Sequence, residues 1–470
     1  MSAEAHELVI LGGGPCGLGA ALRAQEKGLD WLLLEKEGRF GGLASSFRDA
    51  AGFTWDIGGH VLFSHYDTFD RFMEAALGRD GWLYHVRESW VRLRGRFVPY
   101  PFQNNLHRLD PEARWECVEG LLRVWLQRNG QRPAERPADF YEWMRITFGE
   151  GVTRHFMLPY NRKVWTVHPR EMDYGWIGER VAVPDLFRVL RSVCTGQDDV
   201  SWGPNNRFRF PRVGGTGAIW EALGKQLDRG RVRLQEAVVR VDPDRRELET
   251  AAGRAVRYQV LLSTIPLDRL AGMTGRSPWM TAAGHLRHSA VLVVGIGLRG
   301  PVPDGLATKC WMYFPEEQVP FYRVTVFSNY SPANVPAPGE FWSLMTEVAC
   351  QSGSRPEARR VAEEVVAALE REGLIPDRSA IVSVADRYAE YAYPIPIRGR
   401  DGVVDPLLRE LEGQGIFSRG RFGAWKYEVG NMDHCFAQGY ECVERIVAGG
   451  GADREPTLHR PDWVNSRRNK

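Results

Sequence analysis

The feature that most constrains this chain is a glycine-rich turn between a short apolar run and a helix-like segment near the N-terminus. Glu7–Leu11 is apolar and of strand length, and it ends in the turn Gly12–Gly17. The Ala- and Leu-rich Leu18–Lys27 follows at helical spacing, and Trp31–Leu34 is a second apolar run. This order predicts a strand, a tight turn, a helix and a second strand.

The turn has the pattern of a dinucleotide-binding site. Gly12, Gly14 and Gly17 are spaced so that backbone NH groups can approach a pyrophosphate and the helix can pack closely on the strand. Glu35 ends the next strand, where a carboxylate can accept hydrogen bonds from a ribose. A glycine-rich turn without a ligand is the alternative, and the strand, helix and acidic residue around the turn favour the nucleotide site.

Two further glycine pairs distinguish FAD from NAD. The run Gly38–Ser45, with Gly41 and Gly42, resembles the second flavin motif of the amine oxidase and protoporphyrinogen oxidase superfamily. Adjacent glycines let the backbone lie close to a pyrophosphate and a ribityl chain. The second pair, Gly58 and Gly59, is followed by His60 where such proteins hold the isoalloxazine ring. The predicted cofactor is therefore FAD.

The predicted fold class is α/β, with a discontinuous Rossmann-like FAD-binding domain, a helical lobe and a mostly antiparallel β-sheet domain. Apolar runs at Val260–Ile265 and around Gly415–Tyr427 are expected to complete the first fold. The predicted division is an FAD-binding domain of residues 1–105, 206–285 and 397–450, a helical substrate lobe of 106–205, a sheet domain of 286–396 and a C-terminal tail of 451–470. The basic end of this tail, Arg460–Lys470, is expected to be frayed.

Charge and cysteine content argue against several classes of function. Lys and Arg number 61 and Asp and Glu number 59, which leaves a net charge of +2 and no overall field to attract nucleic acid or an anionic membrane. The longest apolar stretches, such as Val291–Leu298, fall short of the roughly 20 residues that span a bilayer. We expect no export signal, because the few residues before the first predicted strand leave no room for a basic segment, an apolar core and a cleavage site.

The seven cysteines are scattered and odd in number, which fits a reducing compartment and predicts no metal site. We expect a cytoplasmic protein with no nucleic-acid or membrane partner, and the sequence leaves a homo-oligomer open.

Motifs along most of the chain resemble one family, UDP-galactopyranose mutase, and in particular its eukaryotic-type branch. They occur in order at Gly58–Tyr66, Tyr100–Asn105, Pro159–Trp165, Trp176–Val181, Trp202–Asn205, Gly214–Gly217, Trp311–Pro315, Phe321–Arg323, Phe327–Pro332 and Ser418–Asn431. Such agreement over three predicted lobes is more specific than any single motif.

The resemblance implies an isomerase that interconverts UDP-galactopyranose and UDP-galactofuranose, with FAD reduced by NADPH or NADH. It implies that N5 of the reduced flavin attacks the anomeric carbon, expels the nucleoside diphosphate and holds the opened sugar until the ring recloses as a furanose. The same reaction on GDP-galactopyranose or another nucleotide sugar stays open. A FAD-dependent oxidase of the amine oxidase type and a non-catalytic flavin-binding scaffold are the other classes considered.

The resemblance also implies roles for four predicted catalytic residues. Arg180 and Arg323 match positions that hold the departing diphosphate, because a guanidinium binds phosphate oxygens in pairs and keeps its charge. Tyr427 adds a hydroxyl donor. For His60 a backbone carbonyl that orients the flavin is favoured over a general-base role.

The other predicted ligands follow from the same motifs. The predicted cofactor ligands are Gly12, Gly14, Gly17, Glu35, Gly41, Gly42, Gly59, His60 and Arg421. The predicted substrate ligands are Tyr100, Phe102, Gln103, Asn161, Trp165, Arg180, Asn205, Tyr313, Arg323, Tyr330, Tyr393, Tyr427 and Asn431. In this set Tyr100 stacks on the base, Gln103 bonds its polar edge, and the asparagines at 161 and 205 reach hydroxyls.

Overall fold

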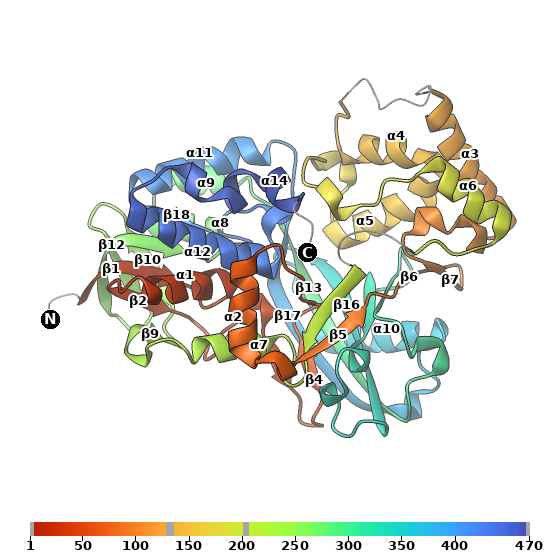
Figure 1. Cartoon of the computed structure of the whole chain (residues 1–470), viewed down its shortest axis with the longest axis horizontal. Coiled ribbons are helices and arrows are strands. Elements are labelled where there is room, and N and C mark those ends of the chain that lie inside the picture. Colours follow the sequence, from red (N-terminus) through yellow and green to blue (C-terminus); the bar gives the residue numbers. More distant parts are fainter. Residues whose placement is uncertain (1–3, 128–135, 201–205, 467–470) are drawn as a thin grey trace.

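The computed structural model describes residues 4–127, 136–200 and 206–466. Its elements form an α/β part built around the glycine turn, a lobe of helices and a second sheet (Figure 1). This arrangement confirms the predicted fold class.

The first sheet has β1 (Glu4–Leu11) at its centre. It pairs in parallel with β2 (Trp31–Leu34) on one side and with β12 (Ala255–Ser263) on the other. Leu8–Leu11 and Trp31–Leu34 are at most 2% exposed, so these two segments are buried on both faces, as continuous apolar runs indicate. The remaining strands of this sheet are β9 (Val232–Arg233), β10 (Val238–Asp242), β11 (Glu247–Thr250) and β18 (Ile416–Ser418).

Helices cover both faces of this sheet because alternate side chains of β1 point to opposite sides. Leu8 and Ile10 pack against one group of helices, and Val9 and Leu11 pack against the other. The first group comprises α1 (Pro15–Glu26), α2 (Asp67–Leu77), α7 (Gly217–Gly224) and α12 (Met432–Ala448). The second comprises α8 (Leu267–Thr274), α9 (Ser277–Ala283) and α11 (Arg400–Gly413).

The second sheet has seven strands in the order β17-β13-β16-β15-β14-β6-β7. All neighbours are antiparallel except β14 and β6, which run parallel. The bounds are β17 (Ile381–Pro394), β13 (His288–Arg299), β16 (Phe341–Gln351), β15 (Arg323–Val326), β14 (Trp311–Tyr313), β6 (Ser89–Leu93) and β7 (Arg96–Pro99). Helix α10 (Ala358–Arg371) packs on one face.

Strands β6 and β7 precede residue 105, so the predicted boundary at that residue does not follow the sheets. Along β6, Ser89, Val91 and Leu93 are buried while Trp90 and Arg92 are partly exposed. This alternation lets the hairpin extend the second sheet, with one face on the core. Two small sheets lie apart from the large ones: β3 (Ser46–Arg48) with β4 (Thr54–Asp56), and β5 (Trp82–Val86) with β8 (Arg207–Pro211).

The helical lobe lies at the upper right of Figure 1 and consists of α3 (Pro111–Gln127), α4 (Phe140–Val152), α5 (Leu158–Trp165) and α6 (Leu186–Thr195). Asp139 caps α4 by accepting a hydrogen bond from the Glu142 NH. Helices α3 and α4 approach closely at glycines, since a Cβ on Gly149 would lie 2.3 Å from the Gly120 carbonyl carbon. Side chains such as Phe140, Met144 and Phe148 fill the interior.

The C-terminal segment, residues 452–466, is packed, so the prediction of a frayed basic end is wrong for residues 460–466. It forms η15 (Ala452–Arg454), α13 (Pro456–His459) and α14 (Pro461–Asn465). Thr457, Leu458 and Val464 are at most 1% exposed. The reason is a buried ion pair of Glu455 with Arg419, which composition alone does not indicate.

Among the described residues, none of the helices combines the length and the apolar character that a membrane span needs.

Candidate functional site

A cavity of about 1020 Å³ is lined by residues of all three parts of the molecule. The glycine turn lies along one stretch of its wall, Arg180 comes from the helical lobe, and Arg323 and Tyr393 come from the second sheet. Chain segments far apart in sequence therefore meet at one internal surface.

The glycine turn presents bare backbone to this cavity. Gly12 has φ +97°, which favours glycine, and an added Cβ on Gly14 would meet no atom closer than 3.9 Å. Gly17 has another function, because its Cβ would lie 1.8 Å from the Gly12 carbonyl oxygen, so it permits close packing of helix and strand. Helix α1 begins directly after Gly14 and directs its N-terminal NH groups at the turn.

Glu35 is held beside the turn at the end of β2. Its carboxylate accepts hydrogen bonds from the Gly13 NH at 2.6 Å and the Glu37 NH at 2.7 Å. Burial raises the pKa of Glu35 although both NH groups act in the opposite direction. Open backbone, a helix N-terminus and an acidic residue together fit a dinucleotide such as FAD. Of the adjacent glycines Gly41 and Gly42, Gly42 lines the cavity and Gly41 does not.

The loop that carries Gly59 and His60 is held at both ends. At one end, the Gly59 NH donates to the Glu347 carboxylate at 3.1 Å. At the other end, the Asp433 carboxylate accepts from the His65 NH at 3.1 Å and lies 2.7 Å from Nδ1 of the His65 ring. His60 Nδ1 is buried and has no hydrogen-bond partner among the described residues. Burial lowers the pKa of His60 to about 4, so its ring is uncharged at neutral pH.

Arg323 lies in the cavity wall and is paired with Glu347. Its Nε and Nη2 donate to the two carboxylate oxygens at 2.6 and 2.7 Å, and the Tyr322 hydroxyl donates to the same carboxylate at 2.6 Å. Burial acts to raise the pKa of Glu347, but the guanidinium and the hydroxyl outweigh it and leave the pKa lowered. An added Cβ on Gly59 would lie 3.2 Å from Arg323 Nη2, so glycine permits this close approach.

Arg180 reaches the cavity from η7 (Gly178–Arg180). Its Nη2 donates to the Glu428 carbonyl oxygen, and its guanidinium carbon lies 5.6 Å from the centre of the Tyr427 ring. Burial lowers the pKa of Arg180, although neighbouring acidic groups act to raise it. No ion pair of Arg180 is present among the described residues, in contrast to Arg323.

Aromatic rings support the cavity wall between the arginines. The Tyr427 ring packs edge-on against Trp165 at 4.9 Å and lies 5.8 Å from Tyr393. The Arg421 guanidinium lies over both tyrosines, at 5.0 Å from Tyr393 and 5.5 Å from Tyr427. Trp165 therefore positions tyrosines that line the cavity and does not line it itself.

The structure thus brings most of the predicted site residues to one cavity. Those that line it are Gly12, Gly14, Glu35, Gly42, Gly59, His60, Tyr100, Arg180, Tyr313, Arg323, Tyr393, Arg421, Tyr427 and Asn431. Asn205 lies outside the described residues.

Five predicted substrate ligands lie behind the wall of the cavity in this structure: Phe102, Gln103, Asn161, Trp165 and Tyr330. Gln103 is buried and donates to the Ala182 carbonyl, so its amide is used within the protein. Asn161 donates to the Met157 carbonyl at 2.7 Å and accepts from Trp165. Phe102 stacks on Phe156, and Tyr330 is a core side chain.

Sequence reasoning missed Glu347, which pairs with Arg323, and Arg87, whose guanidinium lies 5.7 Å from the Tyr100 ring centre. A signal for Glu347 was present, because it is the sole charged residue in the apolar run Phe341–Cys350. A buried charge needs a partner, so an acid in such a strand indicates a nearby cation.

Comparison with known proteins defines the class. The profile of the flavin-containing amine oxidoreductases matches residues 15–447, and the chain belongs to this family. The canine flavin-containing amine oxidase A is 25% identical over 336 residues, which cover 67% of this chain and 58% of that enzyme's length. The family confirms the FAD prediction.

Within this family the structure matches one particular kind of enzyme. The crystal structure of a reduced UDP-galactopyranose mutase superposes with a TM-score of 0.93 at 42% identity, and the match covers 98% of each chain. A fatty acid isomerase from P. acnes matches with a TM-score of 0.63 and 15% identity over 94% of this chain and 98% of that one, which shows the shared fold alone. The predicted resemblance to the mutases is confirmed, and the eukaryotic-type branch stays a prediction.

Proposed function

We propose that this protein is a flavin-dependent isomerase that interconverts UDP-galactopyranose and UDP-galactofuranose. The observation that carries the proposal is the meeting of Arg180, Arg323 and three tyrosines with the glycine turn in one cavity. The substrate of an amine oxidase has no phosphate for a pair of arginines to bind. A substrate with a diphosphate does, and arginine binds phosphate oxygens through paired hydrogen bonds. The neighbouring mutase structure supports the same choice.

FAD would be held by the Gly12–Gly17 turn, Gly42, Glu35 and the loop around Gly59. When bound and reduced, it supplies the nucleophile for the anomeric carbon of the sugar. The Gly59–His60 backbone, held by Glu347, would orient this cofactor. We assign His60 an orienting role, since a ring with a pKa of about 4 is a poor proton acceptor at neutral pH.

Arg180 and Arg323 would bind the diphosphate while it is detached from the sugar. Tyr313, Tyr393 and Tyr427 would add hydroxyl donors to the same oxygens. Burial raises the pKa of Tyr313 and Tyr393, so both hydroxyls keep their protons and can donate. Hydrogen-bond donors that are already in position stabilise charge that develops as the diphosphate leaves.

The base would stack on Tyr100, which lines the cavity with Trp311 and Phe208. With Gln103 bonded to Ala182, uracil has no amide partner at this position in the present arrangement. We keep UDP as the proposed nucleotide, and GDP-galactopyranose is the alternative. NADPH or NADH is the proposed reductant. We place the reaction in the cytoplasm, which the seven free cysteines support.

The test is anaerobic incubation of the dithionite-reduced holoenzyme with UDP-galactopyranose and, in parallel, GDP-galactopyranose, with furanose product measured by chromatography. We expect turnover of the UDP sugar, and none when the flavin is left oxidised. Preference for the GDP sugar would overturn the nucleotide assignment alone. Release of hydrogen peroxide from amines in air, with neither sugar converted, would overturn the proposed function.

A further inference from the structure

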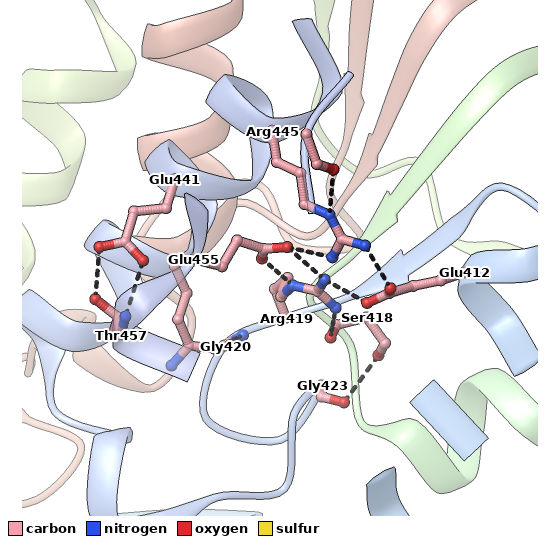
Figure 2. Close-up of polar contacts among 11 residues, drawn as sticks. Glu412, Ser418, Arg419, Gly420, Gly423, Glu441, Arg445, Glu455 and Thr457 are labelled. Carbon is pink, nitrogen blue, oxygen red and sulfur yellow. Dashed lines mark hydrogen bonds and ion pairs between the residues drawn. The ribbon is translucent and has the colours of Figure 1, made fainter. Parts of the chain in front are cut away.

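The C-terminal segment, residues 452–465, is anchored to Arg419, which directly follows β18 and leads into the flavin-side wall of the cavity. Glu455 lies between Arg419 and Arg445, and Glu412 contacts the same two guanidinium groups (Figure 2). Arg419 Nη2 donates to Glu455 at 2.8 Å and to Glu412 at 2.6 Å. Arg419 is the last residue before Gly420, which lines the cavity.

A second contact fixes the short helix α13. The Thr457 NH and hydroxyl donate to Glu441 of α12 at 3.0 and 2.7 Å, as Figure 2 shows. The Tyr66 hydroxyl lies 2.8 Å from Thr457 Oγ1. Because α14 follows after one residue and buries Val464, its position is determined by the same anchors.

Asn465, at the end of α14, lies in the lining of the cavity together with Arg180. Its Nδ2 donates to the Glu428 carbonyl oxygen at 3.0 Å. The same carbonyl oxygen accepts from Arg180 Nη2. The Glu428 side chain is held in turn by Arg400, which donates to its carboxylate at 2.9 and 2.6 Å.

Arg180 of the helical lobe and Asn465 of α14 therefore meet at one carbonyl group, that of Glu428 in η14 (Tyr427–Val429). Its two lone pairs serve two donors, so Asn465 fixes the acceptor against which the Arg180 guanidinium is placed. The two hydrogen bonds from Arg400 hold the Glu428 side chain in place. Among these groups Asn465 is the one that the C-terminal segment contributes.

We propose that Asn465 is a positioning residue for Arg180 and acts through the Glu428 carbonyl. The C-terminal segment thereby sets the geometry in which Arg180 meets a diphosphate. This inference rests on the proposed function in one respect, the role of Arg180 as a diphosphate ligand.

The first experiment measures UDP affinity by calorimetry, together with kcat and KM for UDP-galactopyranose. We expect Asn465→Ala to weaken UDP binding and to raise KM about three- to tenfold, as loss of one hydrogen bond implies, with little change in kcat. Asn465→Asp should lose more, on the order of tenfold or above, because its carboxylate would pair with the guanidinium in place of the phosphate. The matched control is Asp462→Ala on the exposed side of the same helix, which should match the parent.

A double-mutant cycle separates positioning from a general structural effect. In an Arg180→Ala background, Asn465→Ala should cause no further loss of UDP affinity. Equal losses in both backgrounds would overturn the inference. The absorbance spectrum of the bound flavin should be that of the parent in every variant, which shows that each one is folded around its cofactor.

Hydrogen exchange of the holoenzyme tests the inference without any nucleotide. Asn465→Ala should raise exchange at residues 178–186 and 427–431 and leave the helix α1 peptides unchanged. Parental exchange at both segments would overturn the inference even if the enzyme is an active mutase. If the parent neither binds UDP nor converts the sugar, the proposed function fails while this measurement still decides the positioning role.

Discussion

Arg323 donates two hydrogen bonds to the Glu347 carboxylate, at 2.6 Å from Nε and 2.7 Å from Nη2. The same carboxylate accepts from the Gly59 NH, so one acid joins the proposed diphosphate ligand to the proposed flavin loop. Arg180 has no such partner in the described part of the chain and donates to a carbonyl oxygen. The two arginines should therefore respond differently to substitution.

Arg180→Ala and Arg323→Ala should each reduce kcat/KM, with loss of charge-assisted hydrogen bonds of about 1.5–3 kcal/mol. Arg323→Ala should also lower the free energy of unfolding by about 3–5 kcal/mol, because it leaves a buried carboxylate without its cation. Arg180→Ala should cost less stability. Urea unfolding and steady-state kinetics of the two variants test this difference, and equal losses of stability would contradict it. Arg→Lys should restore neither activity fully, since lysine lacks the two-pronged geometry.

Glu347→Gln should make the thermal stability of the protein more dependent on bound UDP. The change removes the negative charge that competes with a diphosphate for Arg323, while the amide keeps the size of the side chain. We expect a lower melting temperature without ligand and a larger rise of that temperature on addition of UDP than in the parent. Differential scanning calorimetry at matched UDP concentrations measures both. A UDP-induced rise no larger than in the parent would contradict the competition.

Asp56 should make part of the stability depend on pH. Burial raises the pKa of Asp56 to about 6, against hydrogen bonds from Ser46 and Thr216 that act to lower it. Because the pKa of Asp56 is higher in the folded than in the unfolded protein, its contribution to stability is fully present at pH values below the unfolded-state pKa. That contribution is lost as the pH rises through 6. Relative to Asp56→Asn, the parent should gain about 2 kcal/mol between pH 7 and pH 4.5. Chemical unfolding of both proteins at the two pH values tests this, and a constant difference would show that Asp56 titrates normally.

Glu455→Ala should destabilise the fold by about 3 kcal/mol, since Arg419 is fully buried and would keep Glu412 as its one remaining carboxylate partner. Asp453→Ala, at an exposed position in the same segment, is the control and should stay within about 0.5 kcal/mol of the parent. Guanidinium unfolding followed by flavin release measures both. A small loss for Glu455→Ala would mean that its ion pairs with Arg419 and Arg445 contribute little to holding the C-terminal segment.

The local parts of the nucleotide site could be predicted because their determinants are close together in sequence. Gly12, Gly14 and Gly17 occupy one turn, and Glu35 follows one helix and one strand later. Backbone geometry at the turn depends on the absence of side chains, which is visible in the sequence. For Arg180, Arg323 and Tyr427, resemblance to the mutase motifs placed residues in the site that spacing alone could not bring together.

Other parts depended on contacts between distant segments. Glu347 and Gly59 are 288 residues apart, and neither residue alone indicates the other. Gln103 and Asn161 have the donors and acceptors of ligand-binding residues, yet both are bonded within the protein. The basic stretch from Arg460 onward resembled a frayed end, although Val464 is 0% exposed.

The sequence by itself determined the α/β class, the flavin turn and the set of residue types from which the site is built, because these follow from local spacing and backbone freedom. The tertiary structure decided which polar groups are available to a ligand and which are already paired. A buried amide or carboxylate must be satisfied by whichever partner the fold brings within about 3 Å. That partner depends on long-range packing, which no local pattern records.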